Sequence, residues 1–384
     1  MRAAALRPPR RDRNAVPPAD RNAVRLHGAE MELTKQDSTK LKGLAALSMV
    51  VLHLFQTNAW QGLYEPLLFI AGKPLVFWFA LLADCCVVIY CFCAGYAHAL
   101  LREKTDLRDY IYGGGERLAR FAVSFWVVVL AFALVALLVG EPYPWLRVLN
   151  NMTFYSLDMN AAWWFVRTYI LLVLFSPILL AGMRKWNWYY FLGGAAVLYC
   201  IGYLLRFKPG YLPVESSFAS NEFALFGTSL LPYVLGIVFY QKKGFSRLST
   251  FVRYTERPAW LSALVCIALV LILTVLHGFV PSLAIAPLTG LGLICAFHFC
   301  PKGKAGNAVF AFLGKHSTNI WLTHMFFYMT LFPGLVFKAR WVLPILLFTL
   351  ALCVGSSVFL QVLQTTLWRC IEWCKNRIAQ RWRV

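Results

Sequence analysis

The chain has 384 residues, of which 60% are hydrophobic and only 14% are charged. An ordinary soluble domain has roughly 25% charged residues, so this composition excludes one and indicates a protein embedded in lipid. Only helices and closed barrels span a bilayer, because each backbone polar group needs a partner within the protein there. The apolar runs are about twenty residues long, which fits helices. We therefore predict an all-α, polytopic membrane protein.

The net charge of +20 raises nucleic-acid binding as an alternative. The basic residues, however, fall mainly in loops on one side of the predicted topology, and no aromatic–basic surface module interrupts the apolar runs. We expect no nucleic-acid partner. The eleven cysteines show no paired CxxC spacing with histidines, so we also expect no metal site and treat the thiols as small apolar groups.

The N-terminal segment differs from the rest of the chain. It is rich in Arg and Pro, it contains DRNAV twice, and it lacks the apolar core of a signal peptide. We expect it to be disordered, and we hypothesise that Met31 is the natural start and residues 1–30 an upstream extension. The predicted division is 1–34 as a basic N-terminal extension, 35–368 as the membrane domain and 369–384 as a basic cytoplasmic tail.

Ten apolar runs follow, separated by charged or Gly/Pro-rich loops, and we predict that each is a transmembrane helix. An even number of spans places both termini on the same side. The loops on that side carry most of the Lys and Arg residues, so the positive-inside rule predicts that both termini are cytoplasmic. The predicted bounds are 41–58, 74–100, 120–140, 162–182, 188–205, 223–240, 259–277, 282–300, 316–337 and 341–367.

His53 lies in the first span, where an ionisable residue indicates function because it is costly in lipid. It follows Lys42 by eleven residues, which places it about 16 Å into the bilayer. Asp84 follows Lys73 by the same interval on the second span, which runs the opposite way, so the two side chains can reach a similar depth. Because a carboxylate orients a basic histidine, we predict a catalytic pair; the alternative is that Asp84 has another partner or faces a polar cavity alone.

Arg117 and Arg120 stand three residues apart at the start of the third span, on one face of a helix. Two guanidinium groups on one face can bind a phosphate, so we predict a site for an anionic cofactor. The alternative is ordinary anchoring at the membrane surface. The preceding Gly113–Gly115 matches no phosphate-binding loop, and we interpret it as a flexible joint.

Three further polar residues are candidates for binding an acceptor. Arg167 lies just inside the fourth span, and it can recognise an acceptor, pair with Asp158 or Glu222, or extend to the interface. Glu222 flanks a loop on the same side of the membrane. His324 follows Lys315 by nine residues, which again gives mid-membrane depth, and it is either a second polar group of the cavity or a packing histidine.

Six motifs in order resemble the acyltransferase-3 family of integral membrane acyltransferases, over residues 35–365. The chain is most similar to the branch found in capsule and surface-polysaccharide loci of Gram-positive bacteria. It departs from that branch at Leu52, where many members have a second histidine, and at Ala94, where the family has serine. The motifs are LKGLAALSMVVLHLF with His53, CFCAGY, ERLARF with Arg117 and Arg120, NAAWWFVRTYILLVLFSP, LLPYVLGIVFYQKKGF and FLGKHSTNIWLTH.

The resemblance implies an O-acyltransferase of the bacterial plasma (inner) membrane that uses acyl-CoA, with acetyl-CoA as the expected donor and no metal. The CoA phosphates would dock from the cytoplasm near Arg117 and Arg120, and His53 would act as general base. The acceptor would be a hydroxyl of a glycan or lipid-linked sugar entering from the other side. Two alternatives stay open: a transporter or flippase of a lipid-linked sugar, and a membrane assembly protein without catalysis. Transfer of succinyl or longer acyl groups is open as well.

Overall fold

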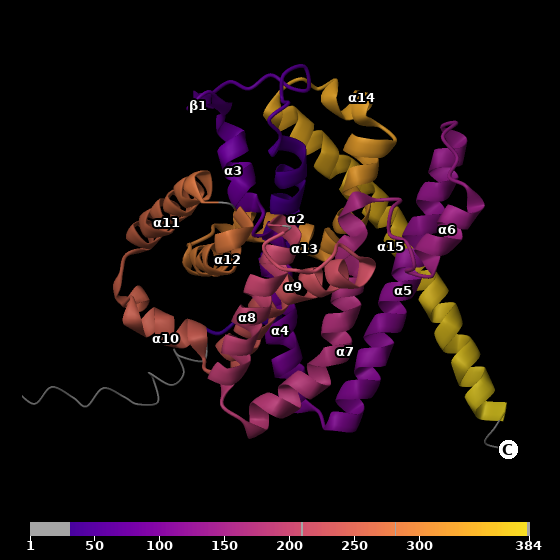
Figure 1. Cartoon of the computed structure of the whole chain (residues 1–384), viewed down its shortest axis with the longest axis horizontal. Helices are drawn as coiled ribbons and strands as arrows, with labels where there is room; N and C mark the ends of the chain where they lie inside the picture. The colour runs from indigo at the N-terminus through magenta and orange to yellow at the C-terminus, as the bar shows by residue number, and fades with distance from the viewer. Residues whose placement is uncertain (1–30, 209, 281, 382–384) are drawn as a thin grey trace, which may run out of the picture.

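The computed structural model describes residues 31–208, 210–280 and 282–381, and it is helical nearly throughout (Figure 1). The predicted all-α class of a polytopic membrane protein is confirmed. The strands of the described residues are limited to a short antiparallel hairpin, β1 (Phe69–Ile70) with β2 (Lys73–Pro74). The expectations for residues 1–30 lie outside the described residues.

Within the described ranges, eight helical stretches are long and apolar enough to cross a membrane. The two other predicted spans coincide with α12, whose apolar part is shorter, and with α13, which carries several polar residues. The helices are α2 (Lys35–Phe55), α3 (Leu75–Ala83), α4 (Cys86–Lys104), α5 (Leu107–Leu138), α6 (Trp145–Met152), η1 (Ala161–Trp163), α7 (Trp164–Lys185), α8 (Trp188–Phe207), α9 (Phe218–Gln241), α10 (Gly244–Phe251), η2 (Tyr254–Glu256), α11 (Ala259–Phe279), α12 (Ser282–Phe299), α13 (Lys304–Met325), η3 (Phe326–Thr330), α14 (Pro333–Phe337) and α15 (Val342–Arg381).

Two predicted elements differ from the structure in a way that affects the site. The third span begins as α5 at Leu107, so Gly113–Gly115 lies inside a helix and the interpretation as a flexible joint is wrong. Asp106 caps this helix by accepting a hydrogen bond from the Asp109 amide at 2.7 Å, and the buried side chain of Tyr110 anchors its first turns. These contacts offset the loss of helix stability at the three glycines, which is roughly 1 kcal/mol for each. The second span is interrupted at Asp84 and Cys85, between α3 and α4.

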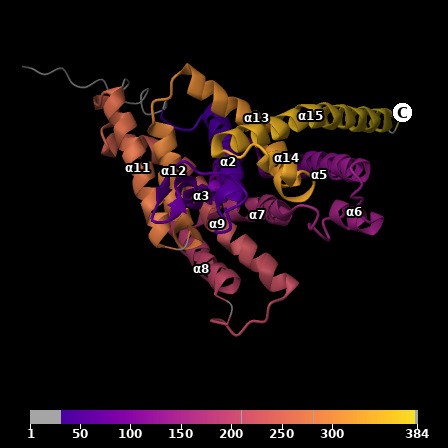
Figure 2. The same cartoon turned by 90° about the horizontal axis from the view of Figure 1, so that it is seen from above.

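The helices surround a central group of α2, α4, α9 and α13 (Figures 1 and 2). Helices α5 and α6 and the long α15 lie on one flank, whereas α11 and α12 lie on the other. The end of α15 projects away from the body. The residues that line the candidate site come mainly from α2, α4 and α13 and from α5 and α7, which pack next to them, with single residues from η1 and α8.

Helices α2 and α13 approach closely enough for their backbones to touch. A Cβ atom on Gly43 would lie 2.0 Å from the carbonyl oxygen of Phe310, and one on Gly314 would lie 1.9 Å from that of Thr39. The crossing of α4 and α9 is equally close at Gly95. Small residues allow such contacts between membrane helices, where lipid provides no hydrophobic force for association. The glycines therefore fix the distance between the helices that carry the site.

Replacing Gly314 by leucine should destabilise the protein, because the new side chain would meet the backbone of α2, which has no room to move. Overpacking of this kind costs about 1–3 kcal/mol. Thermal unfolding of the purified protein in detergent measures the effect. Gly355→Leu is the matched control, since a Cβ at Gly355 meets no atom within 4 Å. Equal unfolding temperatures for the two variants would contradict the crossing.

Candidate active site

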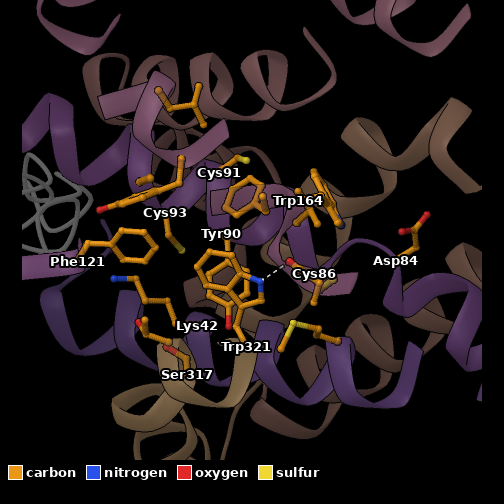
Figure 3. A pocket seen from close by; sticks show the side chains of 18 of the residues that line it. Lys42, Asp84, Cys86, Tyr90, Cys91, Cys93, Phe121, Trp164, Ser317 and Trp321 are labelled. Atoms are coloured by element: carbon orange, nitrogen blue, oxygen red, sulfur yellow. Dashed lines mark hydrogen bonds between the residues drawn. The ribbon is translucent and has the colours of Figure 1, made fainter. Parts of the chain in front are cut away.

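A cavity of about 450 Å³ lies among α2, α4, α5, α7 and α13. Figure 3 shows Lys42 and Asp84 at opposite ends of this central cavity, with Tyr90 and Trp321 between them. We name the two ends after these residues, the Lys42 end and the Asp84 end. The lining of the cavity includes residues of α2 from Lys42 to Gln56, at the C-terminal end of that helix, so the cavity follows most of the length of α2.

Helix α2 supplies one wall of the central cavity. It begins at a capping box in which Thr34 Oγ1 accepts a hydrogen bond from the amide of Asp37 at 3.1 Å. Lys42, His53 and Gln56 line the cavity from this helix. The eleven residues from Lys42 to His53 make just over three full turns, so both side chains lie on the same face. The sequence pattern therefore predicts both their shared face and their separation.

The partner of His53 is His324, and the predicted pair of His53 with Asp84 does not form. His53 Nδ1 lies 2.8 Å from His324 Nε2, and the two rings are stacked with their centroids 4.9 Å apart. His324 is 0% exposed and stands behind His53. This burial also removes His324 from direct contact with an acceptor, which is a correction of its predicted role. A π-helical turn, η3, begins two residues after His324, and such turns are frequent at functional sites.

The hydrogen bonds around the two rings assign their tautomers. His324 Nδ1 lies 3.1 Å from the carbonyl oxygen of Ile320 and 2.9 Å from that of Trp321. Carbonyl oxygens only accept, so this nitrogen carries the proton, and in the neutral ring Nε2 is an acceptor. His53 Nδ1 must then donate to it. The lone pair of His53 is left on Nε2, for which the described residues provide no hydrogen-bond partner.

Asp84 instead belongs to the far end of the cavity. It interacts electrostatically with Arg206, whose guanidinium lies 4.9 Å from the ring centroid of Trp164. All three residues line the central cavity. The prediction that Asp84 pairs with His53 compared the membrane depths of the two residues and assumed that the second span is one unbroken helix. The break between α3 and α4 places Asp84 at a helix junction, while the ring of His53 is held against α13.

The structure separates the two arginines of ERLARF. Arg117 lines the central cavity at its Lys42 end, with its guanidinium 5.5 Å from the ring centroid of Tyr110. Its Nε and Nη2 atoms are buried without a hydrogen-bond partner among the described residues. Arg120 is exposed and pairs with Glu372 at 2.9 Å, over the ring of Trp368 at 4.6 Å. Of the two arginines, only Arg117 is therefore available to a ligand in the cavity.

Lys42 is a site residue that the sequence interpretation did not select. It lines the cavity together with Arg117, and the described part of the chain offers its ammonium group neither an ion pair nor a hydrogen bond. The signal was present in the sequence, because Lys42 shares a helix face with His53. The Lys42 end thus presents two cations, from α2 and α5, and is suited to an anionic ligand.

Arg167 and Glu222 form an ion pair of 2.6 Å, which was one of the two pairings considered for Arg167. The other possible partner, Asp158, pairs with Arg147 at 2.9 Å. Arg167 lies in a separate groove that adjoins the central cavity at Trp164. The structure therefore does not bring Arg167 and Glu222 beside His53.

A family model described as an acyltransferase domain, acyltransferase family 3, matches residues 40–360, which cover most of the chain. The chain belongs to the acyltransferase-3 family. The matched range contains every residue that lines the central cavity, and it makes this protein a membrane acyltransferase. Glu372 and Trp368, which hold Arg120, lie beyond it. No curated protein and no solved structure is significantly similar to the chain.

Nitrogen NMR of protein labelled at histidine tests the tautomers in this acyltransferase. We expect both His53 and His324 to carry the proton on Nδ1. His298 serves as an internal control, because its Nε2 lies 2.9 Å from the carbonyl oxygen of Met31 and must carry the proton there. In His324→Phe, His53 should become a mixture of tautomers. A proton on Nε2 of His53 in the unaltered protein would contradict the assignment.

Proposed function

We propose that this acyltransferase transfers an acyl group, with acetyl as the expected group, from cytoplasmic acyl-CoA to a hydroxyl of a cell-surface or lipid-linked glycan. The observation that carries the proposal is the position of His53, whose unprotonated Nε2 lies in a cavity between a cationic end and an end lined by Asp84 and Arg206. The chemistry follows from the family. The donor, the acceptor and the role of His53 are our proposal.

The Lys42 end is the entrance for the donor. Arg117 and Lys42 would hold the phosphates of CoA, and the unpartnered guanidinium nitrogens of Arg117 would gain charge-assisted hydrogen bonds. We place this end at the cytoplasm, where acyl-CoA is available, and the excess of Lys and Arg in the loops on the predicted cytoplasmic side supports this orientation. The narrow pantetheine arm would then extend along the cavity, over the roughly 16 Å that separates Lys42 from His53 along α2.

His53 acts as general base on the acceptor. Its Nε2 takes the proton of the hydroxyl as the hydroxyl oxygen attacks the thioester carbonyl carbon. The carbon–sulfur bond then breaks, and the CoA thiolate takes the proton from His53, which leaves an acyl ester and free CoA. His324 is the positioning residue: it accepts the Nδ1 hydrogen bond of His53 throughout and stabilises the imidazolium, as a carboxylate does in other enzymes.

The acyl group would therefore cross the membrane through the reaction, without transport of CoA. We infer from the resemblance that the protein lies in a bacterial plasma membrane with both termini cytoplasmic, in the surface-polysaccharide branch of Gram-positive bacteria. The two ends of the central cavity, which differ in the charges that line them, support separate entrances for donor and acceptor.

His53→Ala should reduce transfer by about 10²–10⁴-fold, the usual contribution of a general base. The O-acyl content of surface polysaccharide, measured by NMR in a deletion strain complemented with each variant, reports the loss. His316→Ala is the control, because His316 bonds Ser357 on α15 and does not line the cavity. It should restore acylation when expressed at the same level. Full acylation by His53→Ala would refute the role of His53 as base.

Substitutions of Arg117 and Arg120 should have different effects on the KM for acyl-CoA. Arg117→Ala should raise the KM for acyl-CoA about tenfold or more, since a hydrogen bond to a charged group contributes about 1.5–3 kcal/mol. The KM for the acceptor should not change. Arg120→Ala should change either KM by less than about twofold, because exposed ion pairs contribute little. Steady-state kinetics of the purified protein would contradict this division if both variants raised the donor KM equally.

A further inference from the structure

A second concavity, of about 1100 Å³, opens beside the central cavity. One wall is formed by Asn150 near the end of α6, by residues 153–158 of the loop that follows, and by Ala161 of η1. Trp164 and Arg167 on α7 and Phe218 at the start of α9 form the rest. We call it the Arg167 groove. A smaller depression of about 410 Å³, lined in part by Tyr143 and Arg147, shares Asp158 and Ala161 with it and extends it.

The Arg167 groove meets the central cavity at Trp164, which lines both. Trp164 also stacks with Arg206, which interacts with Asp84. The groove therefore adjoins the Asp84 end and lies away from Lys42 and Arg117. A ligand that enters there approaches His53 from the side opposite the proposed donor entrance.

The walls of the groove combine aromatic rings with hydrogen-bonding groups. Tyr155 is 78% exposed and Phe218 is 65% exposed, and Trp164 is partly exposed between the groove and the cavity. Asn150 and Thr153 add an amide and a hydroxyl, and the side-chain amide of Asn150 makes no hydrogen bond within the described ranges. Sugar rings present C–H faces that stack on aromatic rings and hydroxyls that bond amides, so this composition matches a glycan.

The charged groups of the groove are already paired. Arg167 Nη2 bonds Glu222 at 2.6 Å, and Arg147 bonds Asp158 at 2.9 Å. A phosphate or a uronate would have to displace one of these carboxylates from its arginine. The groove therefore favours an uncharged polyhydroxyl ligand over an anionic one.

The wall of the groove is preformed. Phe154 has a φ of 61°, in the left-handed region that a bulky residue rarely adopts. Two contacts hold it there: its carbonyl oxygen accepts a hydrogen bond from Arg167 Nη1 at 3.1 Å, and its ring stacks on Phe125 at 5.2 Å. Strained backbone of this kind persists where the surroundings impose it, and it clusters at binding sites. Arg167 thus shapes the wall that carries Tyr155.

We propose that the Arg167 groove binds an uncharged segment of the acceptor glycan, and that Trp164 directs the reacting sugar from the groove toward His53. This inference rests on the proposed function and specifies the acceptor site. Arg167 and Glu222 do not lie beside His53, and in this proposal they maintain the shape of the acceptor site. The adjoining depression gives the groove room for more than one sugar.

The double variant Tyr155→Ala/Phe218→Ala tests the groove. The full chain in lipid nanodiscs is assayed with acetyl-CoA and with surface polysaccharide that has been chemically stripped of its ester groups. The acceptor KM should rise about tenfold through the loss of two stacking rings, while the acetyl-CoA KM stays unchanged. Trp145→Ala/Tyr211→Ala is the matched control, because these aromatics are 64% and 75% exposed and lie outside the groove. An acceptor KM equal to that of the control would overturn the proposal.

A binding measurement separates this proposal from the proposed function. Saturation-transfer NMR on His53→Ala protein uses maltohexaose and chitohexaose as neutral probes and trigalacturonate as the anionic one. The neutral probes should receive saturation, and the signal should fall in Tyr155→Ala/Phe218→Ala. If the unaltered protein transfers no acetyl group while this binding is present, the proposed function fails and the groove stands. Binding of trigalacturonate alone, or no loss of signal in the double variant, would refute the groove.

Discussion

The close approach of α2 and α13 is the constraint on which the site depends. Their glycines, Gly43 and Gly314, allow the two backbones to touch. Each histidine of the pair follows its glycine by ten residues, and both helices run in the same direction from the crossing, so His53 and His324 rise to the same level, about 15 Å away. Their hydrogen bond of 2.8 Å follows from this shared offset. In lipid, where packing and buried polar contacts hold helices together, the crossing and the pair support each other.

A histidine is a suitable orienting group at this depth. A buried carboxylate would place a full negative charge in a medium of low dielectric constant before any reaction occurs, and that burial is costly. His324 accepts the hydrogen bond of His53 while both rings are neutral, so the resting site contains no buried net charge at this point. In the proposed mechanism, charge arises only when His53 takes a proton. The carbonyl oxygens of Ile320 and Trp321 lie beside Nδ1 of His324, the ring that accepts the hydrogen bond of His53. Asp84 lies instead at the cavity end, near Arg206.

Hydropathy was enough to predict the helical class, and the cost of a buried ionisable group directed attention to His53, which lines the central cavity. They did not predict its partner, because 271 residues separate the two histidines and their contact depends on a helix crossing. The separation of Arg117 from Arg120 was equally hidden, since Glu372 lies on an extension of α15 beyond the predicted end of the last span. Sequence periodicity reports which face of one helix a residue occupies. It contains no information on which distant segment meets that face.

At Leu52 and Ala94 the chain has apolar residues where the resemblance described above led us to expect polar ones. Both residues line the central cavity. Leu52 lies beside His53 on α2, whereas Ala94 lies on α4. The closest contacts of α2 with α13 are made by other residues, at Gly43, Gly314 and the histidine pair. Leu52 and Ala94 therefore contribute to the surface of the cavity and take no part in the close backbone contacts at Gly43 and Gly314. In this chain the orientation of His53 depends on His324 alone among the described residues, which makes the hydrogen bond between the two rings the decisive contact of the site.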